Sequence, residues 1–341
     1  MKKYIALFAM TALLFSLLAG CGAAPAPAPA PNPAPGSASD LPLQTPEVVK
    51  IGILQPVEHP SLNTIREAII AELDRLGMSD KIEIEYKSAQ GDPATLNTIA
   101  TQFVADGKDL LIPIATPSAQ AAAAATKSIP IVFAAVSDPV TAGLVKDLNV
   151  TDGNITGVSD VLPVDQIFEL AAVLTPQAKT FGVLYCSGES NSYALVEKAR
   201  EYAKLGGITL VEATIADSSE LQQAAQSLVG RVDAIFTPND NVVATAMTAL
   251  ADVAVRAKLP VYVGADSMVA DGGLATVGID YTVLGRQVAA MVKEIIEGKA
   301  IADAPVQSMT DFAKIINTDT AQKIGLVISP DLLKDAQVMG N

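Results

Sequence analysis

Two parts of this chain repeat each other at a spacing of about 130 residues, and this repeat constrains the fold more than any other feature. The aligned pairs include Ile51–Leu54 with Phe181–Leu184, Thr116–Ser118 with Thr237–Asn239, Ile129–Val132 with Leu259–Tyr262, and Gly143–Leu144 with Gly273–Leu274. A repeat of this length is long enough to hold several secondary-structure elements. The chain is therefore expected to fold as two similar halves.

Each repeat unit reads as alternating strands and helices. Short apolar runs such as Lys50–Leu54 and Leu110–Ile114 are typical of parallel strands buried on both faces. The segments between them have a helical period, and the first stripe consists of Leu62, Ile65, Ile69, Leu73 and Leu76. The pattern predicts an α/β fold with two similar Rossmann-like lobes, each a parallel sheet flanked by helices. The cleft between the lobes is expected at the carboxyl ends of the strands.

The segments after the second unit do not form a third one. We expect a helix over Tyr281–Gly298, a strand near Asp311–Ile316 and a final helix, with the chain crossing between the lobes about three times. The expected domains are a signal peptide (1–20), a lipidated cysteine with its tether (21–47), an N-terminal lobe (48–160 plus about 281–308) and a C-terminal lobe (161–280 plus about 309–341).

The N-terminal segment indicates export and membrane anchoring. Two lysines, the apolar run Ile5–Leu18 and small residues before Cys21 are the parts of a secretory signal. Leu18-Ala19-Gly20-Cys21 resembles the bacterial lipobox, in which the cysteine thiol carries an acyl chain such as palmitate. Residues 22–46 contain a run of alternating alanine and proline, a composition that favours an extended spacer. The expected location is the extracytoplasmic face of the cell membrane.

Composition excludes several classes of function. The formal charge of −14 argues against binding nucleic acid. Cys21 and Cys186 are the two cysteines, so no internal disulfide is expected once Cys21 is acylated. The sequence has one histidine, no His/Cys cluster for a metal and no phosphate-binding glycine loop. We therefore expect no enzyme activity, no cofactor and no metal.

The combination of lipobox, tether, duplicated unit and trailing helix resembles a type I periplasmic binding protein of an ABC importer. Within that group the chain is similar to tryptophan and other aromatic amino-acid binding proteins through the segments Ile53–Pro60, Ala115–Gln120, Val183–Ser192, Pro238–Asn241 and Val277–Tyr281. The resemblance implies a monomer that captures an amino acid by hinge closure and delivers it to a permease with its ATPase subunit. Other solutes (a branched-chain amino acid, a sugar or a nucleoside) and a sensor lipoprotein that reports to a signalling receptor are the alternatives.

Polar residues follow the predicted strands at the cleft side of both lobes. The candidate ligand-binding residues are Gln55, His59, Thr116, Ser118, Ser187, Glu189, Asn191, Ser192, Asp240, Asp266, Asp280 and Tyr281. His59, Phe133 and Tyr281 are the rings available to contact a ligand side chain.

Two of these groups suit the ends of an amino acid. Thr116-Pro117-Ser118 reads as a helix start with a hydroxyl at the N-cap, and helix N-termini bind anions, so Thr116 and Ser118 are expected to hold a carboxylate. Asp240 is the first choice for the ammonium and Glu189 the second, with Asp240 as a simple helix cap being the competing interpretation.

Overall fold

The computed structural model describes residues 48–151 and 153–340. The predicted signal peptide, Cys21 and the alanine/proline tether lie outside the described residues. Within the described part no helix is long and apolar enough to cross a membrane.

The first sheet has six strands in the order β11-β5-β4-β3-β1-β2. Its strands are β1 (Val49–Gln55), β2 (Ile82–Ser88), β3 (Leu110–Pro113), β4 (Ile131–Ala134), β5 (Ile155–Ser159) and β11 (Gln307–Ser308). All of its strand pairs are parallel. We call the part of the molecule built on this sheet the N-terminal lobe.

The second sheet has seven strands in the order β13-β12-β10-β9-β8-β6-β7. Its strands are β6 (Thr180–Cys186), β7 (Thr209–Ile215), β8 (Ala234–Thr237), β9 (Val261–Val263), β10 (Ala275–Gly278), β12 (Ala313–Asn317) and β13 (Ala336–Met339). The pair of β10 and β12 is antiparallel, and the others are parallel. We call this part the C-terminal lobe.

The two sheets repeat one topology, as the sequence repeat predicts. The order β2-β1-β3-β4-β5 in one lobe corresponds to β7-β6-β8-β9-β10 in the other. The first strands also pair alike, with Val49 opposite Ile82 and Thr180 opposite Thr209. This arrangement confirms the predicted α/β fold with two Rossmann-like lobes. The final strand β13 was not predicted, because the pattern there was interpreted as a helix alone.

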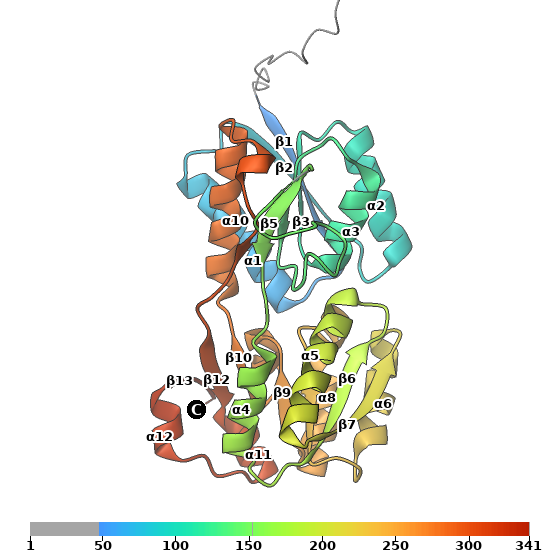
Figure 1. The fold of residues 1–341 in the computed structure, drawn as a ribbon, viewed down its shortest axis with the longest axis vertical. Helices are drawn as coiled ribbons and strands as arrows, with labels where there is room; N and C mark the ends of the chain where they lie inside the picture. The colour runs from blue at the N-terminus through green and yellow to red at the C-terminus, as the bar shows by residue number, and fades with distance from the viewer. Residues whose placement is uncertain (1–47, 152, 341) are drawn as a thin grey trace, which may run out of the picture. The chain divides into compact units, whose positions relative to one another are not determined.

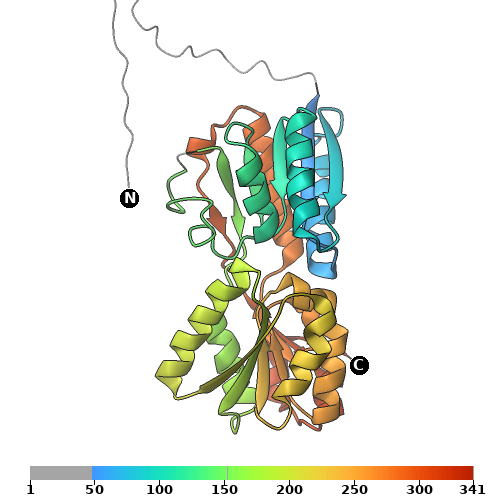
Figure 2. The same ribbon diagram turned by 90° about the vertical axis from the view of Figure 1, so that its right-hand side faces the viewer.

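Helices cover both faces of each sheet (Figures 1 and 2). In the N-terminal lobe, α1 (Pro60–Arg75) and α10 (Tyr281–Ile296) pack on one face, with α2 (Pro93–Ala105) and α3 (Thr116–Ala125) on the other. In the C-terminal lobe, α4 (Val164–Leu174) and α5 (Ser190–Gly206) lie opposite α6 (Leu221–Leu228) and α8 (Met247–Ala257).

The apolar stripe predicted for the first helix forms part of the core. Leu62, Ile65, Ile69 and Leu73 of α1 are buried against β1 and α10. Burial of a side chain of this size contributes about 1.5–3 kcal/mol. Phe133, predicted to face the cleft, is instead fully buried in the core between the first sheet and α2 and α3. That prediction was wrong because the ring of a central-strand residue packs between the layers.

The chain passes between the lobes three times, in agreement with the predicted hinge. The crossings join β5 to α4, β10 to α10, and β11 to β12. Asp160 follows β5 at the first crossing, and Tyr281 begins α10 at the second. Asp160 and Tyr281 therefore lie at the junction of the two lobes.

Candidate functional site

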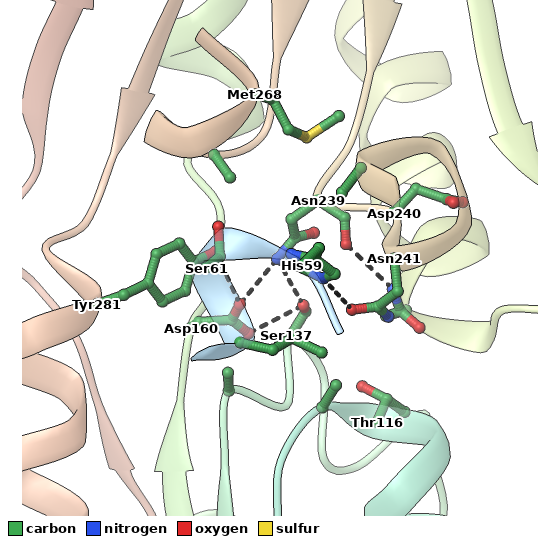
Figure 3. Close-up of a pocket in the computed structure, with 16 residues that line it drawn as sticks. His59, Ser61, Thr116, Ser137, Asp160, Asn239, Asp240, Asn241, Met268 and Tyr281 are labelled. Carbon is green, nitrogen blue, oxygen red and sulfur yellow. Dashed lines mark hydrogen bonds between the residues drawn. The ribbon is translucent and has the colours of Figure 1, made fainter. Parts of the chain in front are cut away.

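A cavity lies between the lobes at the carboxyl ends of the strands (Figure 3). Its empty space, counted together with the open solvent at its mouth, is about 370 Å³. Its polar lining comes from both lobes and includes His59, Ser61, Thr116, Ser137, Asp160, Asn191, Asn239, Asp240, Asn241 and Tyr281. We call it the inner cavity.

The N-terminal lobe presents the start of α3 to this cavity. The N-cap is Ala115, which has a φ of 71° and offers no side-chain cap, so Thr116 lies one position further into the helix than predicted. The first amides of a helix have no partner within it. The hydroxyl oxygens of Thr116 and Ser118 are also buried without a hydrogen-bond partner in the described chain, although Ser118 does not line the cavity. The helix start is thus an unused set of donors.

The backbone around this start is strained at two points. Ala115 and Ala135 both have positive φ angles, 71° and 56°, and both line the inner cavity. Such conformations cost of order 1–3 kcal/mol for a residue with a side chain, and they concentrate at functional sites. Here they follow β3 and β4, where each strand turns toward the cleft.

Asp160 is the most buried carboxyl group on the hinge side of the cavity. Its Oδ1 accepts a hydrogen bond from Ser137 Oγ at 3.0 Å. Its Oδ2 accepts one from Asn239 Nδ2 at 2.8 Å and one from Tyr281 OH at 3.4 Å. Burial raises the pKa of Asp160 to about 6, and the hydrogen bonds from Ser137 and Asn239 oppose that rise. All three partners are neutral, so among residues 48–151 and 153–340 no hydrogen-bond partner brings a positive charge to this carboxylate.

Asn239 connects the two lobes at this point. Its Nδ2 donates both to Asp160 and to Ser137 Oγ at 3.1 Å, while its Oδ1 is buried without a partner. Gly264 keeps the position open, because a Cβ at Gly264 would come within 2.1 Å of the backbone nitrogen of Asn239. Any larger residue at Gly264 would displace the turn that carries Asn239.

A second connection runs through His59. Its Nε2 lies 3.2 Å from Asn241 Oδ1 in the other lobe. Asn241 in turn donates from its side-chain Nδ2 and its backbone N to Glu189 Oε2, at 2.9 and 3.0 Å. Burial lowers the pKa of His59 and outweighs the opposing effect of Asn241. The imidazole is therefore neutral at pH 7.

Glu189 and Asp240 form a buried acidic pair in the C-terminal lobe. Burial and the neighbouring charge of Asp240 raise the pKa of Glu189 to about 8. Burial also raises the pKa of Asp240, although hydrogen bonds from Ser192 and from the backbone amides of Val243 and Cys186 oppose this. Two carboxyl groups this close favour a state in which one of them holds a proton.

The carboxylate of Asp240 bonds within its own lobe, as the helix-cap interpretation of the sequence predicts. Its Oδ1 caps the short helix α7 (Asn241–Thr245) by accepting from Val243 N at 2.9 Å. Its Oδ2 accepts from Cys186 N at 2.7 Å and Ser192 Oγ at 2.6 Å. Both oxygens are thus occupied by the protein's own donors. The competing interpretation, a helix cap, describes this residue better than an ammonium ligand.

The remaining predicted residues fall into two groups. His59, Thr116, Asn191 and Tyr281 line the inner cavity together with Asp240. The other seven do not line it. Gln55 bonds Asn63 and Arg66, Ser192 bonds Asp240, and Asp266 bonds Ser267 N. Ser187 is exposed, Ser118 is buried, Asp280 caps α10, and Glu189 lines a second cavity.

Several residues that line the inner cavity were not among the predicted ligand-binding residues. Asp160, Ser137, Asn239 and Asn241 are polar residues that follow strands, which was the criterion used, but they were not chosen. Asp160 lies where the chain leaves one lobe for the other, at the expected domain boundary. Its position at a crossing was the signal that could have identified it.

The second cavity, which we call the outer cavity, lies beside the first, and its empty space together with the open solvent at its mouth is about 1480 Å³. Pro117 and Val242 line it, whereas their neighbours Thr116 and Asn241 line the inner cavity. The start of α3 and the start of α7 therefore separate the two spaces. Cys186 also lines the outer cavity, and burial raises the pKa of its thiol to about 11, which makes it a poor nucleophile.

Two similar parallel sheets joined by three crossings around a polar cavity define a type I periplasmic binding protein. The family model of ABC transporter substrate binding proteins matches residues 50–339, and the chain belongs to this family. It is 39% identical over 336 residues to a tyrosine-binding protein of Clostridioides difficile (strain R20291), a match that covers 98% of this chain and 95% of the relative. Among residues 48–151 and 153–340, no group of three or more acidic, cysteine or histidine side chains is placed to hold a metal ion.

Two solved structures give a structural comparison. The ABC domain in complex with L-Trp from Streptococcus pneumoniae has a TM-score of 0.83 at 39% identity and covers 86% of this chain and 100% of its own. A ligand-free, open substrate binding protein with adhesive properties from Clostridium difficile has a TM-score of 0.66 at 40% identity with the same coverage.

Proposed function

We propose that this protein is the extracytoplasmic receptor of an ABC importer and that it captures an aromatic amino acid in the inner cavity. The observation that carries the proposal is the set of buried polar atoms without partners around this space. They are Thr116 Oγ1, His59 Nδ1, Asn191 Oδ1 and Asn239 Oδ1. Buried polar groups are almost always hydrogen-bonded in folded proteins, so these atoms call for a ligand.

The two ends of an amino acid suit opposite sides of the cavity. Thr116 Oγ1 and the free amides at the start of α3 suit a carboxylate, because a helix N-terminus attracts negative charge. Asp160, with Asn239 Oδ1 beside it, suits an ammonium. A charge-assisted hydrogen bond of this kind contributes roughly 1.5–3 kcal/mol. An ammonium would also supply the counter-charge that Asp160 does not have in the free protein.

The identity of the relatives supports an aromatic side chain. One relative is a tyrosine-binding protein, and another was solved with L-Trp. The inner cavity offers apolar surface from Leu62, Ala244, Met268 and the ring of Tyr281. Aromatic rings pack favourably against such surfaces and against another ring edge.

Hinge closure would be held by hydrogen bonds that join the two lobes. His59 with Asn241, Asn239 with Asp160, and Ser61 with Ser267 at 2.6 Å all join one lobe to the other. A ligand that contacts both sides adds to these bonds and shifts the population toward the closed form. The closed form is then the one that a permease recognises.

Membrane anchoring through an acylated Cys21 completes the proposal. The segment resembles a lipobox, and an anchored receptor would remain close to its importer. Replacement of Cys21 by serine is expected to release the protein from the membrane fraction. Retention of the variant in that fraction would contradict the anchor.

Calorimetric titration of the ligand-free protein against the amino acids and a sugar panel tests the function. We expect binding of aromatic amino acids, and a loss of roughly tenfold to a hundredfold in affinity for Asp160→Asn. Binding of a sugar with no binding of any amino acid would overturn the proposal. Unchanged affinity in Asp160→Asn would show that the ammonium lies elsewhere.

A further inference from the structure

The contacts around Asn241 determine which way its amide faces. Glu189 Oε2 accepts from the backbone N of Asn241 at 3.0 Å. A backbone N–H can only donate, and Asn191 Nδ2 donates to the same oxygen at 3.1 Å, so we assign any proton of this carboxyl group to Oε1 and treat Oε2 as the acceptor. The side-chain Nδ2 of Asn241 donates to the same oxygen at 2.9 Å. The amide oxygen of Asn241 is therefore the atom that faces His59.

This orientation sets the hydrogen position on His59. Asn241 Oδ1 can only accept, so His59 Nε2 carries the hydrogen across their 3.2 Å contact. The neutral imidazole has one N–H, and it is already used. His59 Nδ1 is thus an acceptor with a free lone pair. It is buried, it has no partner among the described residues, and His59 lines the inner cavity.

An acceptor in this position requires a donor from the ligand. In the proposed function the ammonium lies at Asp160, so the donor has to come from the ligand's side chain. Among aromatic amino acids a phenol O–H or an indole N–H meets this need, and phenylalanine does not.

We propose that His59 Nδ1 accepts a hydrogen bond from the side chain of the bound amino acid and so selects tyrosine or tryptophan over phenylalanine. This inference rests on the proposed function. A site built to hydrogen-bond one polar group rejects the analogue that lacks it, because the buried partner is left unpaired. For one neutral acceptor we expect a preference of roughly tenfold to hundredfold.

Pairs of nearly isosteric ligands test this role. L-Tyrosine is compared with 4-fluoro-L-phenylalanine, and L-tryptophan with its analogue in which sulfur replaces the indole N–H. Calorimetry should give at least a tenfold preference for the donor-bearing member of the pair that binds more tightly. His59→Phe keeps a ring but removes the acceptor, and it should bring this ratio close to one. His59→Leu is a second variant, with the same expectation.

Ser61→Ala is the matched control. It removes another bond between the lobes, that of Ser61 with Ser267, and leaves His59 intact. It should weaken both members of a pair alike and preserve their ratio. The role of His59 would be overturned if the affinity ratio within a ligand pair were near one in the unmodified protein, or if it were unchanged in both His59 variants. Either result would leave the proposed function standing. Failure of all four ligands to bind would overturn the proposed function as well.

Discussion

Helices α3 and α7 begin after corresponding strands of the two lobes, yet their first turns are completed in opposite ways. The start of α3 has no side-chain cap, and the hydroxyl of Thr116 is unpartnered. The start of α7 is closed by Asp240, which accepts from Val243 N at 2.9 Å. In the N-terminal lobe this turn leaves hydrogen-bond donors free. In the C-terminal lobe the corresponding turn is held by hydrogen bonds to Asp240. The two turns therefore have corresponding locations in the repeat, but their side chains have different roles.

The largest expected effect separates these two roles. Asp240→Ala leaves the buried donors of Cys186 N, Ser192 Oγ and Val243 N without an acceptor. We expect it to lower the free energy of unfolding by about 3 kcal/mol. Thr116→Val, at the matching turn, is nearly isosteric and breaks no bond within the protein, so its stability should change by less than about 0.5 kcal/mol while affinity falls about tenfold.

Denaturant unfolding and calorimetry on both variants measure this contrast. The proposed difference between the two helix starts is contradicted if Thr116→Val is the destabilised variant. It is also contradicted if Asp240→Ala is as stable as the unmodified protein and only its affinity for the ligand falls. The second outcome would indicate that Asp240 binds the ammonium group of the amino acid.

The pH dependence of binding should distinguish the acids of the two lobes. Asp160 at the end of the first sheet has a pKa raised to about 6, and Glu189 in the C-terminal lobe has one raised to about 8. An ammonium favours ionised Asp160, so the free protein has to release a proton before binding at lower pH. Affinity should therefore fall about tenfold per pH unit below 6 and stay level above about 7.

Titrations between pH 5 and pH 9 test this expectation, with Asp160→Asn as the control in which the decline below pH 6 disappears. A change in affinity centred near pH 8 would instead assign the ligand charge to Glu189.

The smallest expected effect concerns the stability cost of the acidic pair in the C-terminal lobe. Because the pKa of Glu189 is raised in the folded state, the folded protein binds more protons than the unfolded chain between about pH 4.5 and pH 8. Its contribution to stability therefore falls as pH rises through this window. Glu189→Gln retains an acceptor for Asn241 N and removes the repulsion with Asp240, so it should be more stable by about 1 kcal/mol at pH 8.

Thermal unfolding at pH 5 and pH 8 checks the sign, since the advantage of the glutamine variant should shrink at the lower pH. An equal advantage at both values would attribute the gain to packing and not to charge.

The fold was largely predictable because its signals are local and repeated. The apolar runs and the stripe of α1 predicted their elements, and the repeat predicted that both sheets would have the same strand order. Boundaries were less certain. The N-cap of α3 is Ala115 and not Thr116, because a backbone with positive φ ends the loop there. No propensity favours alanine in that conformation.

The location of the site was predictable from the sequence, but the roles of its residues were not. Strand ends predicted that polar residues would gather at the cleft, and His59, Thr116, Asn191 and Tyr281 do line the cavity. Which acid remains available to a ligand was not predictable. Asp160 and Asp240 are both aspartates that follow a strand, and they differ only in the donors around them.

From the sequence alone came the duplication, the two parallel sheets and the edge where they face each other, because periodicity and repeat spacing are properties of neighbouring residues. The tertiary structure decided that Asp240 is occupied by its own lobe, that Asp160 has only neutral partners, and that Asn241 leaves one nitrogen of His59 unpaired. Those differences depend on donors and acceptors brought together from residues up to 182 positions apart. Hydrogen-bond partners at such separations leave no mark in a local pattern.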